Sequence, residues 1–182
     1  DGLRPHMLMM SATPIPRTLA MSYYADLDVT VLDELPPGRT PIKTRLVADN
    51  RRDDVVGFVR KHVEEGRQVY WVCPLIEESE TLQLKTAMET LSMLRETFPE
   101  LEIALIHGKL DSADKSAIMM AFSQGNIQLL VATTVIEVGV DVPNASLMVI
   151  EHAERMGLSQ LHQLRGRIGR GADAGVCILL FQ

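Results

Sequence analysis

Short apolar runs alternate with longer amphipathic stretches along most of this chain. Each short run has the length of a buried strand, and each longer stretch repeats its apolar residues at the spacing of a helix. This alternation predicts an α/β fold, in which helices cover both faces of a parallel sheet. The expected strands are TRLVAD (44–49), QVYWVC (68–73), EIALIH (102–107), QLLVAT (128–133), SLMVIE (146–151) and GVCILLF (175–181).

Helices are expected between these strands. Asn50 and Asp53 form a capping-box pattern that opens the first helix, which closes before Gly66. The last expected helix lies near 158–170, between the fifth and sixth strands.

The two helices in the middle of the chain have clearer boundaries. One is expected over 80–97, and Asp111 is placed to cap the next, which ends at Gly125. The helix over 80–97 carries an apolar stripe that should face the sheet. The stripe consists of Leu84, Ala87, Met88, Leu91, Leu94 and Phe98.

Residues 1–40 stand outside this alternation. HMLMMSA predicts a strand, PRTLAMSYYA a helix and DVTVLDE another strand, before the proline-rich break LPPGRTP. Two strands and one helix cannot bury a core, so we expect residues 1–40 to be the tail of a preceding domain and residues 41–182 to form one doubly wound domain. Strands without their sheet should pack on a neighbouring copy or on their own domain, or else be mobile.

Composition narrows the class of protein. Hydrophobic residues make up 46% of the 182 positions and charged residues 23%, which is typical of a globular domain rather than a disordered one. No apolar run reaches the roughly 18 residues of a membrane span, and the N-terminus lacks a signal-peptide pattern, so we expect a cytoplasmic protein with no membrane partner. The net charge of −6 argues against a wholly basic surface that coats nucleic acid.

The cysteines and histidines indicate no metal site. Cys73 and Cys177 each lie inside an apolar run and are expected to be buried, reduced thiols. The five histidines show none of the usual metal-binding spacings, so we predict no metal ligands.

Arginines and glycines concentrate in the segment QLHQLRGRIGRG (160–171). On a helix, Gln163, Arg167 and Arg170 would share one face, whereas Arg165 would point elsewhere. Guanidinium groups this close repel one another unless they share an anion, and a polyphosphate fits that need through bidentate contacts. The segment is therefore a candidate phosphate-binding site.

A second candidate is LLVATTVIEVGVDVPNA (129–145), a buried strand that runs into Thr133 and Thr134 and then into a turn with Asp141. Hydroxyl and backbone N–H groups at the carboxyl end of a parallel strand are placed to bind phosphate. The carboxylate of Asp141 can accept a hydrogen bond from a ribose hydroxyl.

Two further segments carry weaker signals. In MSATPIPRT (10–18), Ser11 and Thr13 follow a strand and are placed to relay a hydrogen bond between a nucleotide site and a mobile element. In IHGKLD, His107 is as readily a satisfied strand-end histidine as a nucleic-acid contact, and Gly108 is interpreted as a structural turn.

Each candidate also has a purely structural interpretation. The arginines can form a solvated basic helix face that Glu151 and Glu154 neutralise. The threonines can fill a β-branched strand end, with Asp141 as a turn former. Thr13 can be a plain helix cap.

Taken in order, SAT, the strand with TT and VGVD, and Q-x-x-GRIGR resemble the motifs of the second half of a superfamily 2 helicase motor. More narrowly, SATPIPRTLAM, DELPPGRTP, YWVCPLIEES, LLVATTVIEVGVDVPNAS and GLSQLHQLRGRIGRG resemble the RecG-type ATP-dependent DNA helicases over nearly the whole chain. The transcription-repair coupling factor shares SATPIPRTL and QLHQLRGR, but DELPPGRTP and WVCPLIEES favour the RecG type.

The resemblance implies a RecA-like parallel sheet and a helicase that remodels stalled replication forks and branched recombination intermediates. Gln163, Arg167 and Arg170 match the motif whose arginines reach the γ-phosphate of ATP. Gly139 and Asp141 match the turn beside the nucleotide.

The remaining roles follow from the same resemblance. Thr133 and Thr134 match residues near the DNA phosphates, and Ser11 and Thr13 match the motif that couples hydrolysis to movement. ATP and Mg²⁺ would be bound mainly by a first motor domain upstream of this chain. The implied partners are branched or forked DNA and that first motor domain, in the cytoplasm at the bacterial nucleoid.

The chain lacks the phosphate loop GxxxxGK[ST] that a nucleotide hydrolase needs, because its one Gly-Lys pair is followed by Leu110. We therefore expect the chain by itself to be inactive as an ATPase. A translocase like the transcription-repair coupling factor and a non-catalytic nucleic-acid-binding module are the alternative functions.

Overall fold

A computed structural model of the chain separates two units, Asp1–Leu35 and Pro36–Gln182. The elements predicted within residues 1–40 fall almost wholly outside the described residues, so their assignment to a preceding domain, and their packing, stay predictions. The structure describes residues 8, 10, 30–32, 34, 40–74, 80–133, 142–171 and 174–182.

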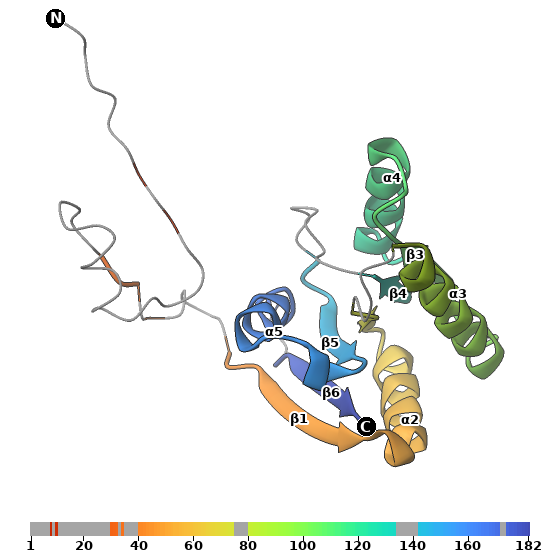
Figure 1. The fold of residues 1–182 in the computed structure, drawn as a ribbon, viewed down its shortest axis with the longest axis horizontal. Helices are drawn as coiled ribbons and strands as arrows, with labels where there is room; N and C mark the ends of the chain where they lie inside the picture. Colours follow the sequence, from red (N-terminus) through yellow and green to blue (C-terminus); the bar gives the residue numbers. More distant parts are fainter. Residues whose placement is uncertain are drawn as a thin grey trace, which may run out of the picture. The chain divides into compact units, whose positions relative to one another are not determined.

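The described residues of Pro36–Gln182 form one sheet of six parallel strands. The strands are β1 Lys43–Ala48, β2 Gln68–Val72, β3 Ile103–Ile106, β4 Leu129–Ala132, β5 Ala145–Ile150 and β6 Val176–Phe181. Their order across the sheet is β1-β6-β5-β2-β4-β3 (Figure 1). Each predicted strand is confirmed within one residue at either end.

Helices cover both faces of this sheet, as predicted (Figure 1). They are α2 Arg52–Glu64, α3 Glu80–Thr97, α4 Ser112–Ser123 and α5 Leu158–Arg165, with short 3₁₀ turns η1 Asp49–Arg51 and η2 Ala153–Arg155. Residues from α4 and α5 pack in one core, and residues from α2 and α3 pack in the other. No helix in the described part of the chain is long and apolar enough to cross a membrane.

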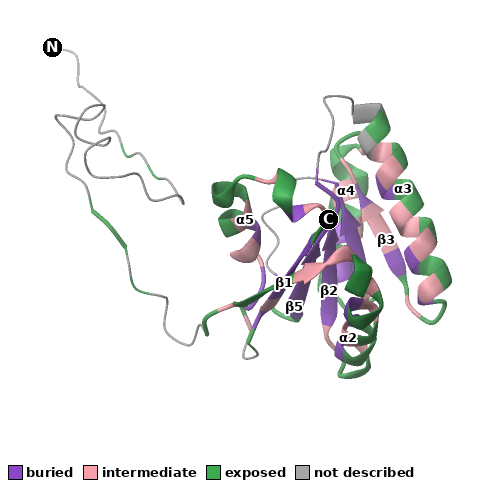
Figure 2. Cartoon of the chain, turned by 60° about the horizontal axis from the view of Figure 1, so that its bottom comes forward, coloured by how far each residue is buried: buried purple, intermediate pink, exposed green. Residues whose placement is uncertain are grey.

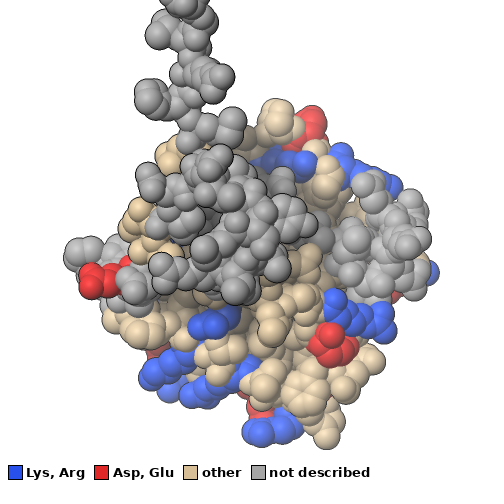
Figure 3. Space-filling model, turned by 60° about the vertical axis from the view of Figure 1, so that its left-hand side comes forward, with Lys and Arg blue, Asp and Glu red and all other residues tan. Residues whose placement is uncertain are grey.

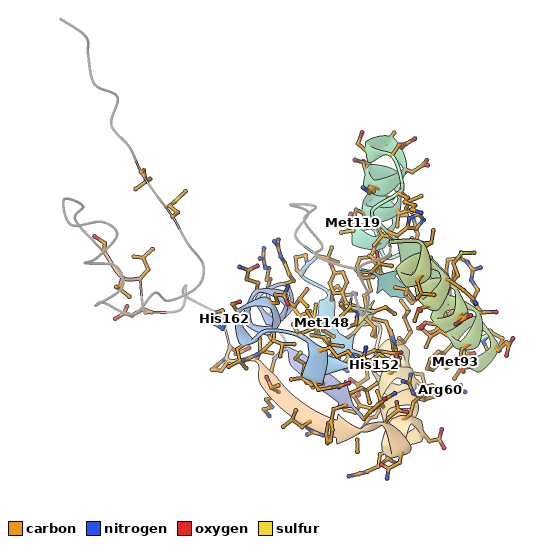
Figure 4. The ribbon with its side chains drawn as sticks, viewed as in Figure 1. Arg60, Met93, Met119, Met148, His152 and His162 are labelled. Atoms are coloured by element: carbon orange, nitrogen blue, oxygen red, sulfur yellow. The ribbon has the colours of Figure 1, made fainter. Side chains whose placement is uncertain are left out.

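The period-two alternation of the strands divides the sheet between two cores. Tyr70 and Val72 of β2 face α4 and α5, whereas Val69 and Trp71 face α2 and α3. Every residue of β2, β4 and β5 is buried, which Figure 2 shows as purple central strands beneath helices with green outer faces. In Figure 4, Met119 of α4 and Met148 of β5 belong to the first core and Met93 of α3 packs against the second.

The predicted helix boundaries have mixed outcomes. Asp111 caps α4 as expected, because its carboxylate accepts a hydrogen bond of 2.7 Å from the backbone N–H of Asp114. The predicted capping box of Asn50 and Asp53 is wrong. Residues 49–51 form the turn η1, α2 begins at Arg52, and no side chain caps it.

The prediction that Met88 belongs to the buried apolar stripe of α3 is also wrong. Ala87, Leu94 and Phe98 are fully buried, but Met88 is 57% exposed. Met88 follows Ala87 by one residue and therefore lies about 100° around the helix from it. Because α3 packs mainly on the edge strand β3, the sheet does not extend far enough to cover that side of the helix.

Glu151, at the carboxyl end of β5, joins three elements through buried polar contacts. Its two carboxylate oxygens accept hydrogen bonds of 2.9 and 3.1 Å from the guanidinium of Arg52, and one also accepts a bond of 2.7 Å from the indole N–H of Trp71. Asp49 binds the other edge of Arg52, at 2.7 and 3.0 Å. These contacts hold the pKa of Arg52 above its usual range and attach the start of α2 to the sheet.

We expect Glu151→Gln to lower the free energy of unfolding by about 2 to 3 kcal/mol, because it leaves the partly buried Arg52 with Asp49 alone. Urea denaturation followed by the fluorescence of Trp71 measures this. Glu154→Gln, at an exposed acid of η2, is the control and should change stability by less than about 0.5 kcal/mol. Equal stability of the two variants would contradict the importance of the Arg52 pair.

Candidate functional site

The arginine-rich segment leaves the helix before its two candidate catalytic arginines. Helix α5 ends at Arg165, so Gln163 lies on the helix, whereas Arg167 and Arg170 lie in the turn beyond it. The prediction that these three residues share one helix face is therefore wrong. The turn continues through backbone bonds from Arg167 N–H to the carbonyl of Leu164, at 2.9 Å, and from Ile168 N–H to that of Arg165, at 3.3 Å.

We call residues 166–171 the arginine turn. Its apolar residue, Ile168, is fully buried in the core that lies between the sheet and helices α4 and α5. Arg170 is exposed, Arg167 is half-buried, and the Nε of Arg170 donates to the carbonyl of Gly166 at 3.1 Å. The buried isoleucine thus anchors a turn that carries the half-buried Arg167 and the exposed Arg170.

Glycines allow this turn to approach other backbone segments closely. Gly169 has φ +67°, and a Cβ there would lie 3.2 Å from the backbone of Gly175. A Cβ on Gly171 would lie 2.6 Å from the carbonyl oxygen of Pro143. The helix ends early because the chain must pass against these two segments.

The arginine turn lies at the amino ends of the strands. Gly175 immediately precedes β6, and Pro143 precedes β5 by two residues. Thr133 lies at the opposite end, directly after β4, where its backbone N–H donates to the carbonyl of Ile106 at 3.2 Å. A strand of four residues is roughly 13 Å long. The structure therefore places the candidate arginines and Thr133 in two separate places.

The environment of Thr133 bears on its candidate role. It is only 3% exposed, so a DNA phosphate would reach its hydroxyl only if its surroundings opened. The other candidate residues lie outside the described part of the chain. They are Thr134, Gly139, Asp141, Ser11 and Thr13.

A basic corner that sequence reasoning underrated lies beside Thr133. His107 follows β3, and the ammonium of Lys115 donates to the carbonyl of Gly108 at 2.9 Å. Burial lowers the pKa of His107, and the positive charges of Lys115 and Lys109 lower it further. The chain makes a turn at Gly108, as predicted, and this turn gathers two cations at the carboxyl end of the sheet.

The proposed neutralisation of the arginines by Glu151 is wrong, because Glu151 pairs with Arg52. Glu154 lies 3.6 Å from the ring of His152 and 4.0 Å from the guanidinium of Arg155. His152 itself has a left-handed backbone, with φ 47°, and turns the chain from β5 into η2. Figure 4 labels His152 there and His162 on α5.

The two cysteines are buried and unpaired, as predicted. Burial raises the pKa of each thiol to about 12, and the charge of Arg165 opposes that rise at Cys177. Figure 3 views the molecule from the side of α5 and β1, where Lys and Arg side chains form several separate groups with acidic residues among them. Among the described residues, no three His, Cys, Asp or Glu side chains gather as a metal site requires.

The comparisons with known proteins agree with this fold. Residues 51–172, more than half of the chain, match the helicase conserved C-terminal domain. The chain therefore belongs to that family.

Within the family, the chain is similar to ATP-dependent DNA helicases RecG. It is 60% identical to RecG of Escherichia coli (strain K12) over its full length, and 59% identical to RecG of Acidithiobacillus ferridurans over 99% of its length. The chain spans about a quarter of these relatives, 26% in each case. The predicted resemblance to the RecG type is confirmed.

A solved structure agrees in fold as well as in sequence. The structure of RecG bound to a three-way DNA junction matches the whole chain with a TM-score of 0.78 and 45% identity, and the chain covers 25% of it. The predicted fold class, a RecA-like parallel sheet with helices on both faces, is confirmed.

We expect Gly171→Ala to lower the free energy of unfolding by about 1 to 3 kcal/mol, because the new methyl group would collide with the backbone of Pro143. Gly57→Ala is the control. Gly57 lies in α2 with open space around it, so alanine should stabilise the chain by up to about 1 kcal/mol. Urea denaturation of both variants measures the two free energies of unfolding. If both variants were destabilised, or both stabilised, the close approach at Gly171 would be contradicted.

Proposed function

We propose that this chain is the second motor domain of an ATP-dependent DNA helicase that remodels stalled replication forks and branched recombination intermediates. The observation that carries the proposal is the arginine turn, in which a buried Ile168 holds the half-buried Arg167 and the exposed Arg170 at one end of the sheet. Support comes from relatives named as ATP-dependent DNA helicases and from a solved RecG bound to a three-way DNA junction.

In this proposal, Gln163, Arg167 and Arg170 reach the γ-phosphate of ATP that a first motor domain holds. Planar guanidinium groups suit this role because they bind phosphate oxygens bidentately and stabilise the charge of the transition state. Gly139 and Asp141 would border the nucleotide. Pro143, two residues after Asp141, lies against Gly171, which supports a position near the arginines.

Mg²⁺ would be held by the phosphates of ATP and by the first motor domain. The chemistry that it supplies is neutralisation of the phosphate charge. The residues of this chain would orient the γ-phosphate and exclude water, because they close over it from the opposite side.

DNA would be bound at the carboxyl end of the sheet. Thr133 and Thr134 would contact DNA phosphates there, next to Lys109 and Lys115. Such contacts are independent of base sequence and are weakened by salt. Ser11 and Thr13 would couple ATP hydrolysis to movement of the two domains.

The motor would work by opening and closing. Binding of ATP between the two domains draws the arginines toward the phosphate, and hydrolysis releases them. Each cycle would advance the protein along duplex DNA in the cytoplasm, at the bacterial nucleoid.

We expect Arg167→Ala and Arg170→Ala each to lower the kcat of DNA-stimulated ATP hydrolysis by about 10³-fold or more in the full-length protein. Stability and DNA affinity should change little, since both side chains lie outside the core. Lysine should not restore activity at either position, because a point charge cannot replace the guanidinium fork. Initial rates with forked DNA measure this.

Arg155→Ala provides the matched control, because Arg155 is an exposed arginine of η2 outside the arginine turn. It should retain nearly the wild-type kcat. An Arg170→Ala protein with wild-type activity, or an Arg167→Ala protein that unfolds, would contradict the assignment of the chemistry to this turn.

We also expect the 182-residue chain by itself neither to hydrolyse ATP nor to bind it tightly, since it holds only the arginine half of the site and lacks a phosphate loop. Calorimetric titration with Mg-ATP and a phosphate-release assay with forked DNA test this. DNA-stimulated hydrolysis by the purified chain, free of contaminating ATPase, would refute the two-domain assignment.

A further inference from the structure

Ile42, the residue before β1, lies against the arginine turn. Its Cγ1 atom would be 3.4 Å from a Cβ on Gly169 and 3.3 Å from a Cβ on Gly175. A methyl group would therefore just touch Ile42 from Gly169 and would crowd it from Gly175. The next residue, Lys43, donates its backbone N–H to the carbonyl of Gly175 at 2.9 Å. The start of β1 is thus fixed both to the arginine turn and to the segment that leads into β6.

The side chain of Arg165 also contacts Ile42. Its Nη2 atom donates a long hydrogen bond, 3.4 Å, to the carbonyl oxygen of Ile42. Its Nε atom is buried and has no hydrogen-bond partner among the described residues, which is costly for a polar group. The hydrogen bond to Ile42 is therefore the contact through which the end of α5 supports the start of β1.

The positions of these contacts connect two parts of the chain that are far apart in sequence. Ile42 directly precedes β1, near the beginning of the unit Pro36–Gln182. Arg165 ends α5 and directly precedes the arginine turn. The start of the first strand of the sheet therefore supports a turn that lies more than 120 positions later in the sequence.

We propose that Ile42 and Arg165 are positioning residues that fix the arginine turn to the start of β1 and so set where Arg167 and Arg170 lie. Neither residue touches the nucleotide in this proposal. It rests on the proposed function, in which those two arginines act on the γ-phosphate. Loosening the support should misplace the guanidinium groups without unfolding the domain.

The first test uses the 182-residue chain and needs no activity. Hydrogen exchange measured by NMR at the amides of Arg167 and Ile168 should become at least about threefold faster in Ile42→Ala and in Arg165→Met. Amides of the central strand β2 should keep their rates. Leu46→Ala is the matched control. Leu46 lies on β1, the strand that Ile42 precedes, but its side chain is 73% exposed.

The second test measures DNA-stimulated ATP hydrolysis in the full-length protein. Ile42→Ala and Arg165→Met should lower kcat by about 10- to 100-fold, while the KM for ATP stays within twofold. Arg165→Lys, which keeps one donor for the carbonyl of Ile42, should recover part of the loss. Arg155→Met, at an exposed arginine, should behave as wild type.

The outcomes separate the proposal from the function on which it rests. Faster exchange at Arg167 and Ile168 together with a lower kcat supports it. Unchanged exchange at these amides, or faster exchange that extends equally to β2, would overturn it. If the wild-type protein shows no ATPase activity, the proposed function fails, and the exchange result alone still decides whether Ile42 and Arg165 support the turn.

Discussion

Burial of the sheet on both faces is the constraint on which the rest of this structure depends. Every residue of β2, β4 and β5 is buried, so no polar side chain of catalytic use can project from the middle of these strands without a large desolvation cost. Chemistry is confined to the strand ends and the connections between them. The arginine turn and the basic corner at Lys109 and Lys115 both lie at such positions.

The arginine turn shows how a fixed position is obtained outside regular structure. The apolar side chain of Ile168 is buried in the core, which favours one position of the turn. The close approach of Gly169 and Gly171 to other backbone segments, and the hydrogen bond from Arg165 to Ile42, restrict the turn further.

Local patterns in the sequence located the strands and one helix cap, but they failed at the start of α2, where the capping box predicted for Asn50 and Asp53 does not form. The alternation of apolar residues located each strand within one residue, and the Asp111 cap was readable because its partner, Asp114, is three residues away. Long-range contacts were not readable. Arg52 pairs with Glu151, 99 positions away in the sequence. Because Glu151 binds Arg52, it does not neutralise the arginines at 165–170, as one interpretation of the sequence had expected.

The end of α5 was mispredicted for the same physical reason. A helix through residue 170 satisfies the local pattern, but Gly169 must pass within van der Waals distance of Gly175, and only the folded sheet brings these residues together. The exposed Met88 depends likewise on where the sheet ends beneath α3. The types of the candidate site residues were therefore visible in the sequence, while the geometry of those that the structure describes was set by the tertiary fold.

The separation of the two candidate regions has a consequence for coupling between ATP and DNA. Thr133 ends β4 at the carboxyl edge of the sheet, and Val142 leads into β5 at the amino edge, beside the arginine turn. Residues 134–141 join these two points covalently, so they are the shortest chain path from the proposed DNA phosphates to the proposed ATP site. The strands on either side are buried and closely packed, and such an interior is hardly compressible, so a displacement at one end of the sheet is transmitted to the other. In the proposed motor, the rigid sheet therefore links the two ligands, together with movement of the whole domain.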